Sequence, residues 1–510
     1  MIATAHCAAL RGIDAYPVQL EVDFSRSGLP AFTMVGLAEG AVRESKERVY
    51  SSLKNSGFKL PPARTTVNLA PADVRKEGSA YDLPLALGLL AASGAIDAES
   101  MPGWYMAGEL SLTGEIKPVN GVLPLAITAE RAKAKGLIVP AANAAEAAVV
   151  RGLPVYGLEN LAEVVGLVTG EEEFEPARLD IDTLWNERQS FHYDFSEVKG
   201  QEHAKRAIEI AAAGAHNLLF IGPPGSGKTM LSQRIPTVLP PLGFDEALEV
   251  TKIYSVAGLL NGSQSLIVTR PFRSPHHTIS DIGLIGGGRY PQPGEVSLAH
   301  RGVLFLDEMP EFKKQALEVL RQPLEDGEVS ISRSLMSLSY PADFMLVAAM
   351  NPCPCGYLTD DRHQCTCSPA GVGRYRAKLS GPLLDRIDLH VDVPAVPYED
   401  LKEERGSVDS ATMRERILAA RRVQRERYEG LLIHTNAQLT GSALEEHCRC
   451  GRDEHGFLEQ AVKALGLSAR AYTRILRIAR TIADIEGEER IAVPHLAEAI
   501  NYRTMDRQGG

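Results

Sequence analysis

One segment has the residue types and spacing of a phosphate-binding loop. Its eight residues follow an apolar run at 217–221 and match the pattern Gly-x-x-x-x-Gly-Lys-Ser/Thr: Gly222, Pro223, Pro224, Gly225, Ser226, Gly227, Lys228 and Thr229. Glycines let backbone N–H groups surround a phosphate chain at the start of a helix, where the helix dipole also favours negative charge. We expect Lys228 to reach the β- and γ-phosphates and the Thr229 hydroxyl to hold Mg²⁺.

A second apolar run ends in two carboxylates that suit metal binding and proton transfer. Residues 303–306 are Val-Leu-Phe-Leu, and Asp307 and Glu308 follow them. A buried strand of this kind delivers acidic residues to the carboxyl edge of a parallel sheet. After a phosphate-binding loop, Asp307 is expected to bind Mg²⁺ through water, and Glu308 to orient and deprotonate the attacking water.

Other polar residues can complete a phosphoryl-transfer site. Asn351 follows a third apolar run and can hold the water or the γ-phosphate, with a turn cap as its alternative role. Arg386 can supply positive charge from a neighbouring subunit, although its residue type alone favours a surface salt bridge. Arg470 at a helix start is another candidate, and Arg474 and Arg477 compete with it. No Asn-Lys-x-Asp segment follows the loop, which favours adenine over guanine.

Six of the seven cysteines lie in Cys-x-Cys pairs, which indicates metal binding more than disulfides, because cytosolic thiols stay reduced. Two pairs flank nine residues and can form a tetrahedral Zn²⁺ site: Cys353, Cys355, Cys365 and Cys367. The sequence leaves two equally weighted alternatives for these cysteines: they bind Zn²⁺, or they are free thiols. His363 could replace one of the four cysteines as a ligand. A bound Zn²⁺ would be structural, bracing the loop between Asn351 and Arg386, because four thiolates leave no open position.

The first part of the chain predicts an α/β domain. Residues 1–170 alternate short β-type runs with Ala-rich helical stretches. The runs lie at 18–22, 65–69 and 136–139, and the helical stretches at 82–93 and 123–134. An acidic, Pro-bearing segment then predicts a solvated linker over 171–190.

The rest of the chain predicts an α/β core followed by helices. Strands and helices alternate again over 191–400, which includes the three apolar runs that end in the candidate site. Residues 401–510 have a helical pattern, strongest at 413–428 and 469–485. The sequence as a whole therefore predicts the α/β fold class, with a helical C-terminal part.

Length and composition exclude several classes of protein. A chain of 510 residues predicts about three domains. The net charge of -11 means that any contact with DNA must come from a local basic stripe. The 44% hydrophobic and 23% charged residues are typical of a soluble protein, and the apolar stretches fall short of the ~20 residues that cross a bilayer. Residues 1–22 lack the features of a secretory signal, so we expect a cytoplasmic protein.

The order of the motifs resembles the AAA+ ATPases and, within them, the magnesium-chelatase-like branch. The resemblance rests on Phe195-Ser-Glu-Val-Lys-Gly-Gln201, the phosphate-binding loop, Asp307-Glu308, Asn351, Leu383-Leu-Asp-Arg386 and Arg470. It implies that Gln201 and its neighbours approach adenine and that Asn351 is sensor 1. It also implies that Arg386 is an arginine finger acting in the next subunit and that Arg470 is sensor 2. Such proteins form rings, so a hexamer with a helical lid on each AAA+ core is expected.

The spacing within the core predicts an insertion. Seventy-eight positions separate Thr229 from Asp307, more than one strand and one helix need. By the same resemblance, this insertion and a later β-hairpin are loops of the ring pore. Four of their residues would bind DNA phosphates without sequence preference: Arg273, Arg289, Arg333 and Ser334. Ordinary loop or subunit contacts stay an open alternative, because no base-stacking pattern stands out.

The N-terminal part contains the segments Lys76-Glu-Gly-Ser-Ala-Tyr-Asp82-Leu-Pro-Leu-Ala and Gly114-Glu-Ile-Lys-Pro-Val-Asn-Gly121-Val-Leu-Pro-Leu. By these segments it resembles the fold of Lon protease and RadA, which is related to ribosomal protein S5 domain 2. The nucleophilic serine position falls on Ala80 and its lysine on Leu123, so the domain is expected to be proteolytically inactive. The chain as a whole is similar to the ComM (YifB) family. This implies an ATP-driven motor that acts as a branch-migration helicase in homologous recombination and natural transformation. A protein-remodelling or metal-chelatase-type ATPase is the alternative.

Overall fold

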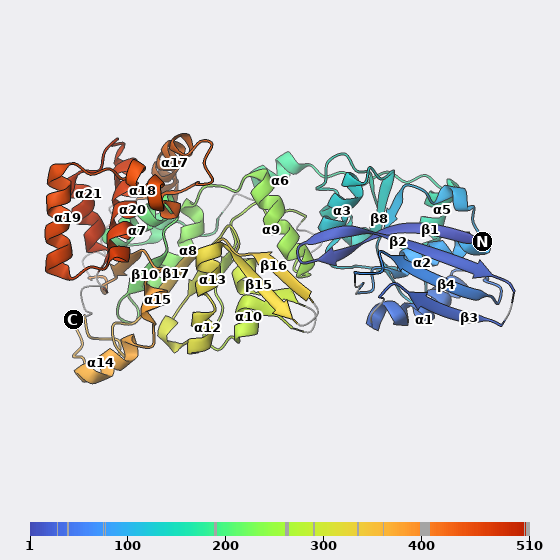
Figure 1. The fold of residues 1–510 in the computed structure, drawn as a ribbon, viewed down its shortest axis with the longest axis horizontal. Coiled ribbons are helices and arrows are strands. Elements are labelled where there is room, and N and C mark those ends of the chain that lie inside the picture. Colours follow the sequence, from blue (N-terminus) through green and yellow to red (C-terminus); the bar gives the residue numbers. More distant parts are fainter. Residues whose placement is uncertain are drawn as a thin grey trace. The chain divides into compact units, whose positions relative to one another are not determined.

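The chain forms two compact units. The computed structural model describes residues 1–27, 29–37, 40–74, 76, 78–187, 191–260, 265–288, 291–333, 336–360, 362–397, 408–503 and 505. One unit comprises Met1–Arg188, Phe244–Val268 and Ser332–Tyr340. The other comprises Gln189–Gly243, Thr269–Ile331 and Pro341–Gly510, and it carries the candidate active site (Figure 1).

A mixed seven-stranded sheet organises the first unit. Its strand order is β3-β4-β2-β1-β5-β8-β9. The strands are β1 (Ile2–Arg11), β2 (Asp14–Ser25), β3 (Ala31–Val35), β4 (Arg64–Ala70), β5 (Trp104–Met106), β8 (Gly136–Pro140) and β9 (Val155–Leu158). β1, β2 and β4 pair antiparallel, and the remaining neighbours pair parallel. The predicted runs at 18–22, 65–69 and 136–139 are therefore confirmed as strands.

Helices cover this sheet. They are α1 (Gly40–Asn55), α2 (Asp82–Ser93), α3 (Val122–Arg131) and α5 (Leu161–Thr169). α2 matches its predicted range, packs on β1 and β2, and is buried from its first residue to Ala92. The segment predicted as a linker, 171–190, contains a short helix, α6 (Ile181–Glu187).

A helix from the middle of the chain, beyond the phosphate-binding loop, belongs to this first unit. α9 (Phe244–Val256) packs on α3, and Gly121 N–H donates to the Ser255 carbonyl at 3.0 Å. The Ser255 hydroxyl donates to the buried carboxylate of Glu146, which also accepts from Leu123 N–H at 2.9 Å. Burial raises the pKa of Glu146, and these hydrogen bonds partly oppose that rise. The unit thus includes part of the insertion that the spacing predicts.

A five-stranded parallel sheet forms the core of the second unit. Its order is β11-β14-β17-β10-β18, and each neighbouring pair is parallel. The strands are β10 (Leu218–Ile221), β11 (Phe272–Arg273), β14 (Val303–Leu306), β17 (Met345–Met350) and β18 (Leu389–Asp392). Every residue of β10, β14 and β17 is buried, which explains their continuous apolar sequences. The predicted α/β fold class is confirmed.

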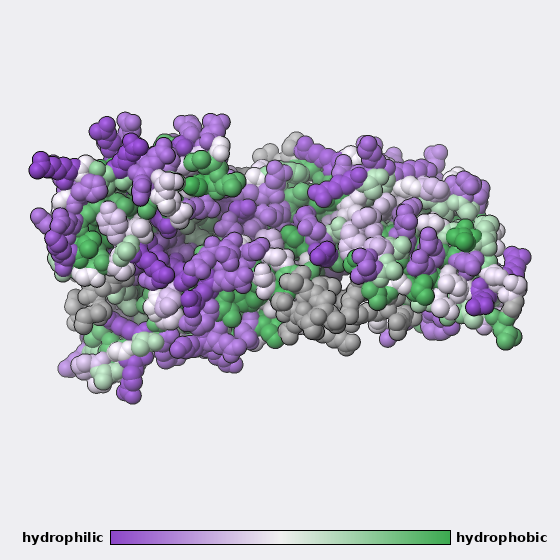
Figure 2. All heavy atoms as spheres, viewed as in Figure 1, coloured by the Kyte–Doolittle hydropathy of each residue, from purple (hydrophilic) through white to green (hydrophobic). Residues whose placement is uncertain are grey.

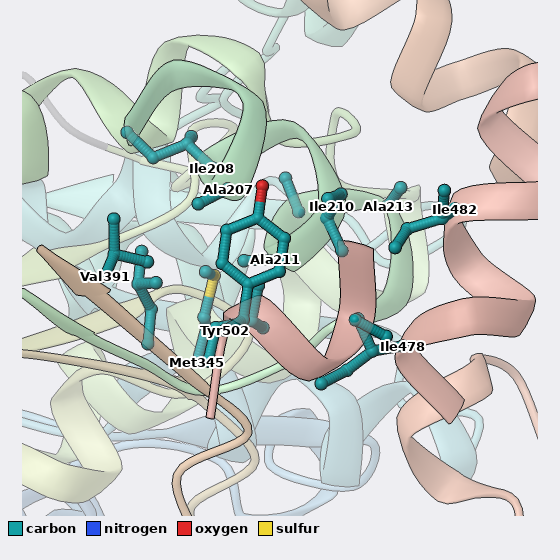
Figure 3. Packing of buried hydrophobic residues seen from close by; sticks show 14 of the residues in the cluster. Ala207, Ile208, Ile210, Ala211, Ala213, Met345, Val391, Ile478, Ile482 and Tyr502 are labelled. Atoms are coloured by element: carbon teal, nitrogen blue, oxygen red, sulfur yellow. The ribbon is translucent and has the colours of Figure 1, made fainter. Parts of the chain in front are cut away.

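Helices surround this sheet and continue to the end of the unit. α7 (Glu202–Gly214) precedes β10, and α8 (Lys228–Val238) follows it. The later helices are α17 (Ser410–Arg427), α18 (Gly441–His447), α19 (Arg452–Leu465), α20 (Ala469–Glu486) and α21 (Val493–Asn501). Ile478 and Ile482 of α20 pack in one apolar cluster with α7 residues and with Met345 of β17 (Figure 3). The predicted helical lid therefore shares its hydrophobic core with the sheet.

The face drawn in Figure 2 is mainly hydrophilic, with apolar residues in small separate groups. Within the described ranges, no helix combines the length and apolar character needed to cross a membrane.

Candidate active site

The phosphate-binding loop connects β10 to α8, as its sequence predicts. Gly225 has φ 75° and Gly227 has φ 92°, both in the left-handed region that favours glycine. A Cβ atom at Gly222 would lie 2.1 Å from the carbonyl oxygen of Val393, so only glycine fits there. Gly227 caps α8, and Lys228 is its first residue. The loop thus presents backbone N–H groups at a helix N-terminus.

The ammonium group of Lys228 lies on the inner side of this loop. Its Nζ donates to the carbonyls of Gly222 at 2.7 Å and Pro223 at 2.9 Å, and it lies 3.4 Å from Asn351 Oδ1. Burial lowers the pKa of Lys228, while the charges of Asp307 and Glu308 partly oppose that shift. The cation is therefore held beside the position where the loop would bind phosphates.

Three neighbouring strands bring the remaining polar groups to the same edge. β17 lies between β14 and β10, with Leu306 opposite Ala348 and Ile221 opposite Met350. Asp307 and Asn351, which follow these strands, therefore lie beside the loop. The predicted convergence of Lys228, Asp307 and Asn351 is thus present in the structure.

The hydroxyl of Thr229 donates to Asp307 Oδ2 at 2.7 Å. A hydroxyl and a carboxylate oxygen are hard donors of the type that Mg²⁺ prefers, with water and phosphate oxygens in its other positions. The two residues expected to hold Mg²⁺ therefore fit that ion.

Glu308 begins a sharp turn and borders a small cavity. Its φ of 51° is left-handed, which ends β14 abruptly, and its N–H donates to Asp307 Oδ1 at 2.9 Å. His277 Nδ1 lies 3.4 Å from Glu308 Oε2. Both residues line a cavity of about 230 Å³ together with Ser274, Pro275, His276 and Asp307.

The sequence by itself does not single out His277 as part of the site. Its position after β11 was the available signal, because β11 is parallel to β14 and residues after neighbouring parallel strands meet at one edge. β11 has only two residues, Phe272 and Arg273, and so gives little periodic pattern.

Gln201 lies beside the phosphate-binding loop. Its side-chain Nε2 donates to the Pro394 carbonyl at 2.7 Å and to the Ser226 carbonyl at 3.3 Å. Gly200 and Gln201 both have φ 60°, which turns the chain tightly before α7. The structure thus brings Gln201 to the loop, and its approach to adenine stays a prediction.

The two arginines expected to act as finger and sensor have carboxylate partners. Arg386 pairs with Glu325. Arg470 pairs with Asp385 at 2.8 Å, and its side chain is 70% exposed. Arg474, a competing candidate, lies 3.4 Å from Asp388 and 3.9 Å from Asp385. The structure thus places Arg470 beside the segment that carries Arg386, and both proposed roles stay predictions.

The residues expected to bind DNA are only partly described. Arg273 makes a two-pronged salt bridge with Glu295, at 2.6 and 2.7 Å. Arg289 and Ser334 lie outside the described residues, as does the side chain of Arg333. The hairpin itself is present as β15 (Glu328–Arg333) and β16 (Met336–Pro341). DNA binding by this group stays a prediction.

The four cysteines proposed as ligands come together in space. The sulfur atoms of Cys353, Cys355, Cys365 and Cys367 all lie within 4.8 Å of one another. Cys448 and Cys450 are free thiols as well.

The positions aligned with the Lon nucleophile and lysine lie in the first unit. Leu123 is fully buried in α3, and Ala80 precedes α2, where its carbonyl accepts from Gly108 N–H at 3.0 Å. Ala80 has no hydroxyl, and Leu123 has no basic group.

Comparison with known families matches three segments of the chain. The family described as "Magnesium chelatase, subunit ChlI" matches residues 194–401, which hold the site just described. "Subunit ChlI of Mg-chelatase" matches residues 20–143, and "Magnesium chelatase, subunit ChlI C-terminal" matches residues 407–503.

Comparison with curated proteins gives relatives over the full length. "Competence protein ComM" of Haemophilus influenzae is 45% identical over 99% of this chain and 98% of its own length. "Uncharacterized protein YifB" of Salmonella typhimurium is 43% identical with the same coverage. "Magnesium-chelatase 38 kDa subunit" of Rhodobacter capsulatus is 26% identical over 31% of this chain and 50% of its own length. The chain therefore belongs to the ComM/YifB family of magnesium-chelatase-like AAA+ proteins.

Proposed function

We propose that this protein is an ATPase whose active site is the edge formed by β10, β14 and β17. The observation that carries the proposal is the 2.7 Å hydrogen bond between Thr229 and Asp307. This hydrogen bond joins Thr229 and Asp307, the two candidates for binding Mg²⁺, beside the phosphate-binding loop. The two residues come from segments that are far apart in the sequence. Mg²⁺ bound there would neutralise charge on the β- and γ-phosphates.

Different residues of the site would carry out different steps of ATP hydrolysis. The loop N–H groups and Lys228 bind the phosphate oxygens, and Asn351 orients the attacking water. Water attacks the γ-phosphorus, and the bond from this phosphorus to the β-phosphate oxygen breaks, which releases ADP and phosphate. Glu308 accepts the proton of the water, because its carboxylate is not bonded to Thr229 as that of Asp307 is.

We further propose that ATP turnover drives a cytoplasmic hexameric ring that moves DNA strands, as a branch-migration helicase in recombination and natural transformation. The full-length similarity to a protein named for competence supports this proposal. In the ring, Arg386 would act on ATP bound to the neighbouring subunit, and Arg470 would act as sensor 2. Arg273, Arg289, Arg333 and Ser334 would contact DNA phosphates in the pore.

The second candidate function is remodelling of a protein partner, as in a chelatase motor. The match of the site-bearing segment to a magnesium chelatase subunit favours it. Arg273 also supports this alternative, because its salt bridge with Glu295 competes with phosphate contacts.

Rates of ATP hydrolysis distinguish the two functions. We expect single-stranded DNA or a four-way junction to raise the rate of the purified protein, and higher salt to weaken this effect. Displacement of strands from the junction would support branch migration. Equal rates with and without DNA, together with no salt-sensitive DNA binding, would favour protein remodelling.

The proposed cofactors are ATP and Mg²⁺ at this site and a structural Zn²⁺ at the cysteine cluster. ATP is supported by the family and by the loop geometry, Mg²⁺ by the contact of Thr229 with Asp307, and Zn²⁺ by the convergence of four thiols.

A further inference from the structure

Four thiols converge in the loop that follows β17. The Cys353 sulfur lies 3.4 Å from the Cys355 sulfur and 3.7 Å from the Cys365 sulfur. The sulfurs of Cys355 and Cys365 are 3.6 Å apart, and Cys367 completes the group. All four cysteines are free thiols. Two pairs from opposite ends of one loop therefore meet at a single point.

These distances fit a tetrahedral Zn²⁺ site. Zn–S bonds of about 2.3 Å place sulfur atoms about 3.8 Å apart, whereas a disulfide needs about 2.0 Å. Cys353 is buried and the other three are partly buried, so an ion would be shielded and still have a path of entry. Among the described residues, the group whose ligand atoms all lie within 4.8 Å of one another consists of these four cysteines and does not include His363.

Gly356, which directly follows the first cysteine pair, packs against the phosphate-binding loop. Gly356 has φ 88°, and a Cβ atom there would lie 2.6 Å from Cδ of Pro224. Gly356 N–H donates to the Cys353 carbonyl at 3.0 Å, which makes the turn that contacts Pro224. Two residues before Cys353, the Asn351 side chain lies 3.4 Å from Lys228 Nζ. The cysteine loop and the phosphate-binding loop therefore support each other.

The cysteine loop is irregular, and hydrogen bonds such as that from Arg362 to the Val396 carbonyl hold it only at single points. Its described residues between 351 and 368 form neither helix nor strand, and those from 357 onward are exposed or only partly buried. An irregular loop of this length loses much conformational entropy when it is ordered. One ion bound by all four thiolates would cross-link its two ends.

We propose, resting on the nucleotide site proposed above, that the four cysteines bind one Zn²⁺ and that this ion holds the loop 352–368 against Pro224. ATP affinity then depends on the metal. Without the ion, the turn at Gly356 no longer supports the phosphate-binding loop, and Asn351 is no longer fixed beside Lys228.

The metal part of the proposal is tested by elemental analysis of the full-length protein purified in reducing buffer. We expect about one Zn²⁺ per chain in the wild type, and loss of the metal in the Cys355→Ser/Cys367→Ser double variant. Cys450→Ser is the matched control, because Cys450 is also a partly buried thiol in a Cys-x-Cys pair. It should keep its Zn²⁺. Wild-type protein without Zn²⁺ that also binds no added Zn²⁺ would overturn the proposal.

The coupling part is tested by the affinity for a fluorescent, non-hydrolysed ATP analogue. Removal of Zn²⁺ from the wild type by a chelator, followed by transfer to chelator-free buffer with Mg²⁺, should weaken binding by at least about tenfold, and added Zn²⁺ should restore it. The double variant should bind as weakly, while Cys450→Ser should match the wild type. Unchanged affinity after loss of Zn²⁺ would overturn the coupling. Failure of the Zn²⁺-loaded wild type to bind the analogue would instead count against the proposed ATP site.

Discussion

Glu308 directly follows Asp307, the acid that accepts a hydrogen bond from Thr229. Its Oε2 atom lies 3.4 Å from His277 Nδ1. Its side chain is 56% exposed, so water can reach it. The two adjacent acids both border the cavity but differ in their contacts: Asp307 accepts from the Thr229 hydroxyl, while Glu308 lies beside His277. This separation suits one metal ligand and one proton acceptor.

We expect Glu308→Gln to keep nucleotide affinity and lower kcat on the order of 10²- to 10⁴-fold, because the amide cannot accept the proton. ATP hydrolysis and binding of an ATP analogue, measured on the same preparation, check this. Glu311→Gln is the control, since Glu311 lies three residues on and pairs with Lys378. Normal turnover in Glu308→Gln would refute the assignment of the base.

Asp388 is a buried carboxylate with a lowered pKa. Burial by itself raises its pKa, but His216, Arg474 and Arg477 outweigh this and lower the pKa to about 2. Because this value is below that of an unfolded aspartate, about 3.9, ionised Asp388 stabilises the fold above about pH 4. The contribution is lost as the pH falls from about 4 to about 2.

We expect Asp388→Asn to lower the free energy of unfolding by about 2 to 3 kcal/mol at pH 7 and by about half as much at pH 3. Denaturant unfolding at both pH values measures this difference. Asp453→Asn, at an exposed position, should change the free energy by less than about 0.5 kcal/mol at either pH. An effect of Asp388→Asn that does not depend on pH would contradict the assigned ionisation.

At the scale of elements, the helices of the C-terminal part are joined by a buried polar network. Asp484 of α20 accepts two hydrogen bonds from Arg427 of α17, at 2.6 and 2.9 Å. It also accepts from Arg480 at 3.0 Å and from Asn436 at 2.8 Å. Asp484 is only 4% exposed, so its charge is balanced almost entirely by these partners.

We expect Asp484→Ala to destabilise the second unit by about 3 to 5 kcal/mol, because it leaves the buried Arg480 and the partly buried Arg427 without their carboxylate. Lys463→Ala is the comparison, since Lys463 and Glu459 form an exposed pair on α19. Its effect should stay below about 1 kcal/mol. Midpoints of denaturant unfolding, followed by circular dichroism, measure both changes. Similar shifts of the unfolding midpoint in the two variants would contradict the claim that burial makes the Asp484 contacts stronger than the exposed pair.

At the scale of the whole molecule, the proposed ring needs a cation that acts between subunits. Arg386 is paired with Glu325 in its own chain, and its side chain is only 12% exposed. Action on a neighbouring nucleotide would therefore require Arg386 to exchange this partner for a phosphate, and Arg is suited to both because its guanidinium binds carboxylate and phosphate alike.

We expect Arg386→Ala to assemble and bind ATP but to lose hydrolysis by about 10³-fold or more, as for other arginine fingers. Lys228→Ala should also lose hydrolysis, but for a different reason: it lacks the lysine that contacts the phosphates in its own phosphate-binding loop. Mixing the two inactive variants should restore part of the hydrolysis, since some interfaces then combine an intact Lys228 with an intact Arg386. Absence of any recovery in mixed assemblies that sizing confirms would count against action between subunits.

The motifs of the proposed ATP site could be identified from the sequence because each depends on local chemistry. The phosphate-binding loop needs its own glycines, and β10, β14 and β17 are continuous apolar runs because both faces of the sheet are covered. The convergence of Lys228, Asp307 and Asn351 also followed, since parallel strands end at one edge. In the first unit, β2 could be predicted because its apolar and polar residues alternate, and the structure buries alternate residues of this strand.

Other features depended on contacts between distant segments, and only the tertiary structure decided them. The pairing of Arg470 with Asp385 spans 85 positions, and that of Arg386 with Glu325 spans 61. No local pattern of residues specifies which carboxylate an arginine will meet. The same is true of His277 beside Glu308 and of α9 in the first unit. Apolar periodicity and turn chemistry fix elements, whereas long-range ion pairs and docked helices depend on how the chain packs in three dimensions.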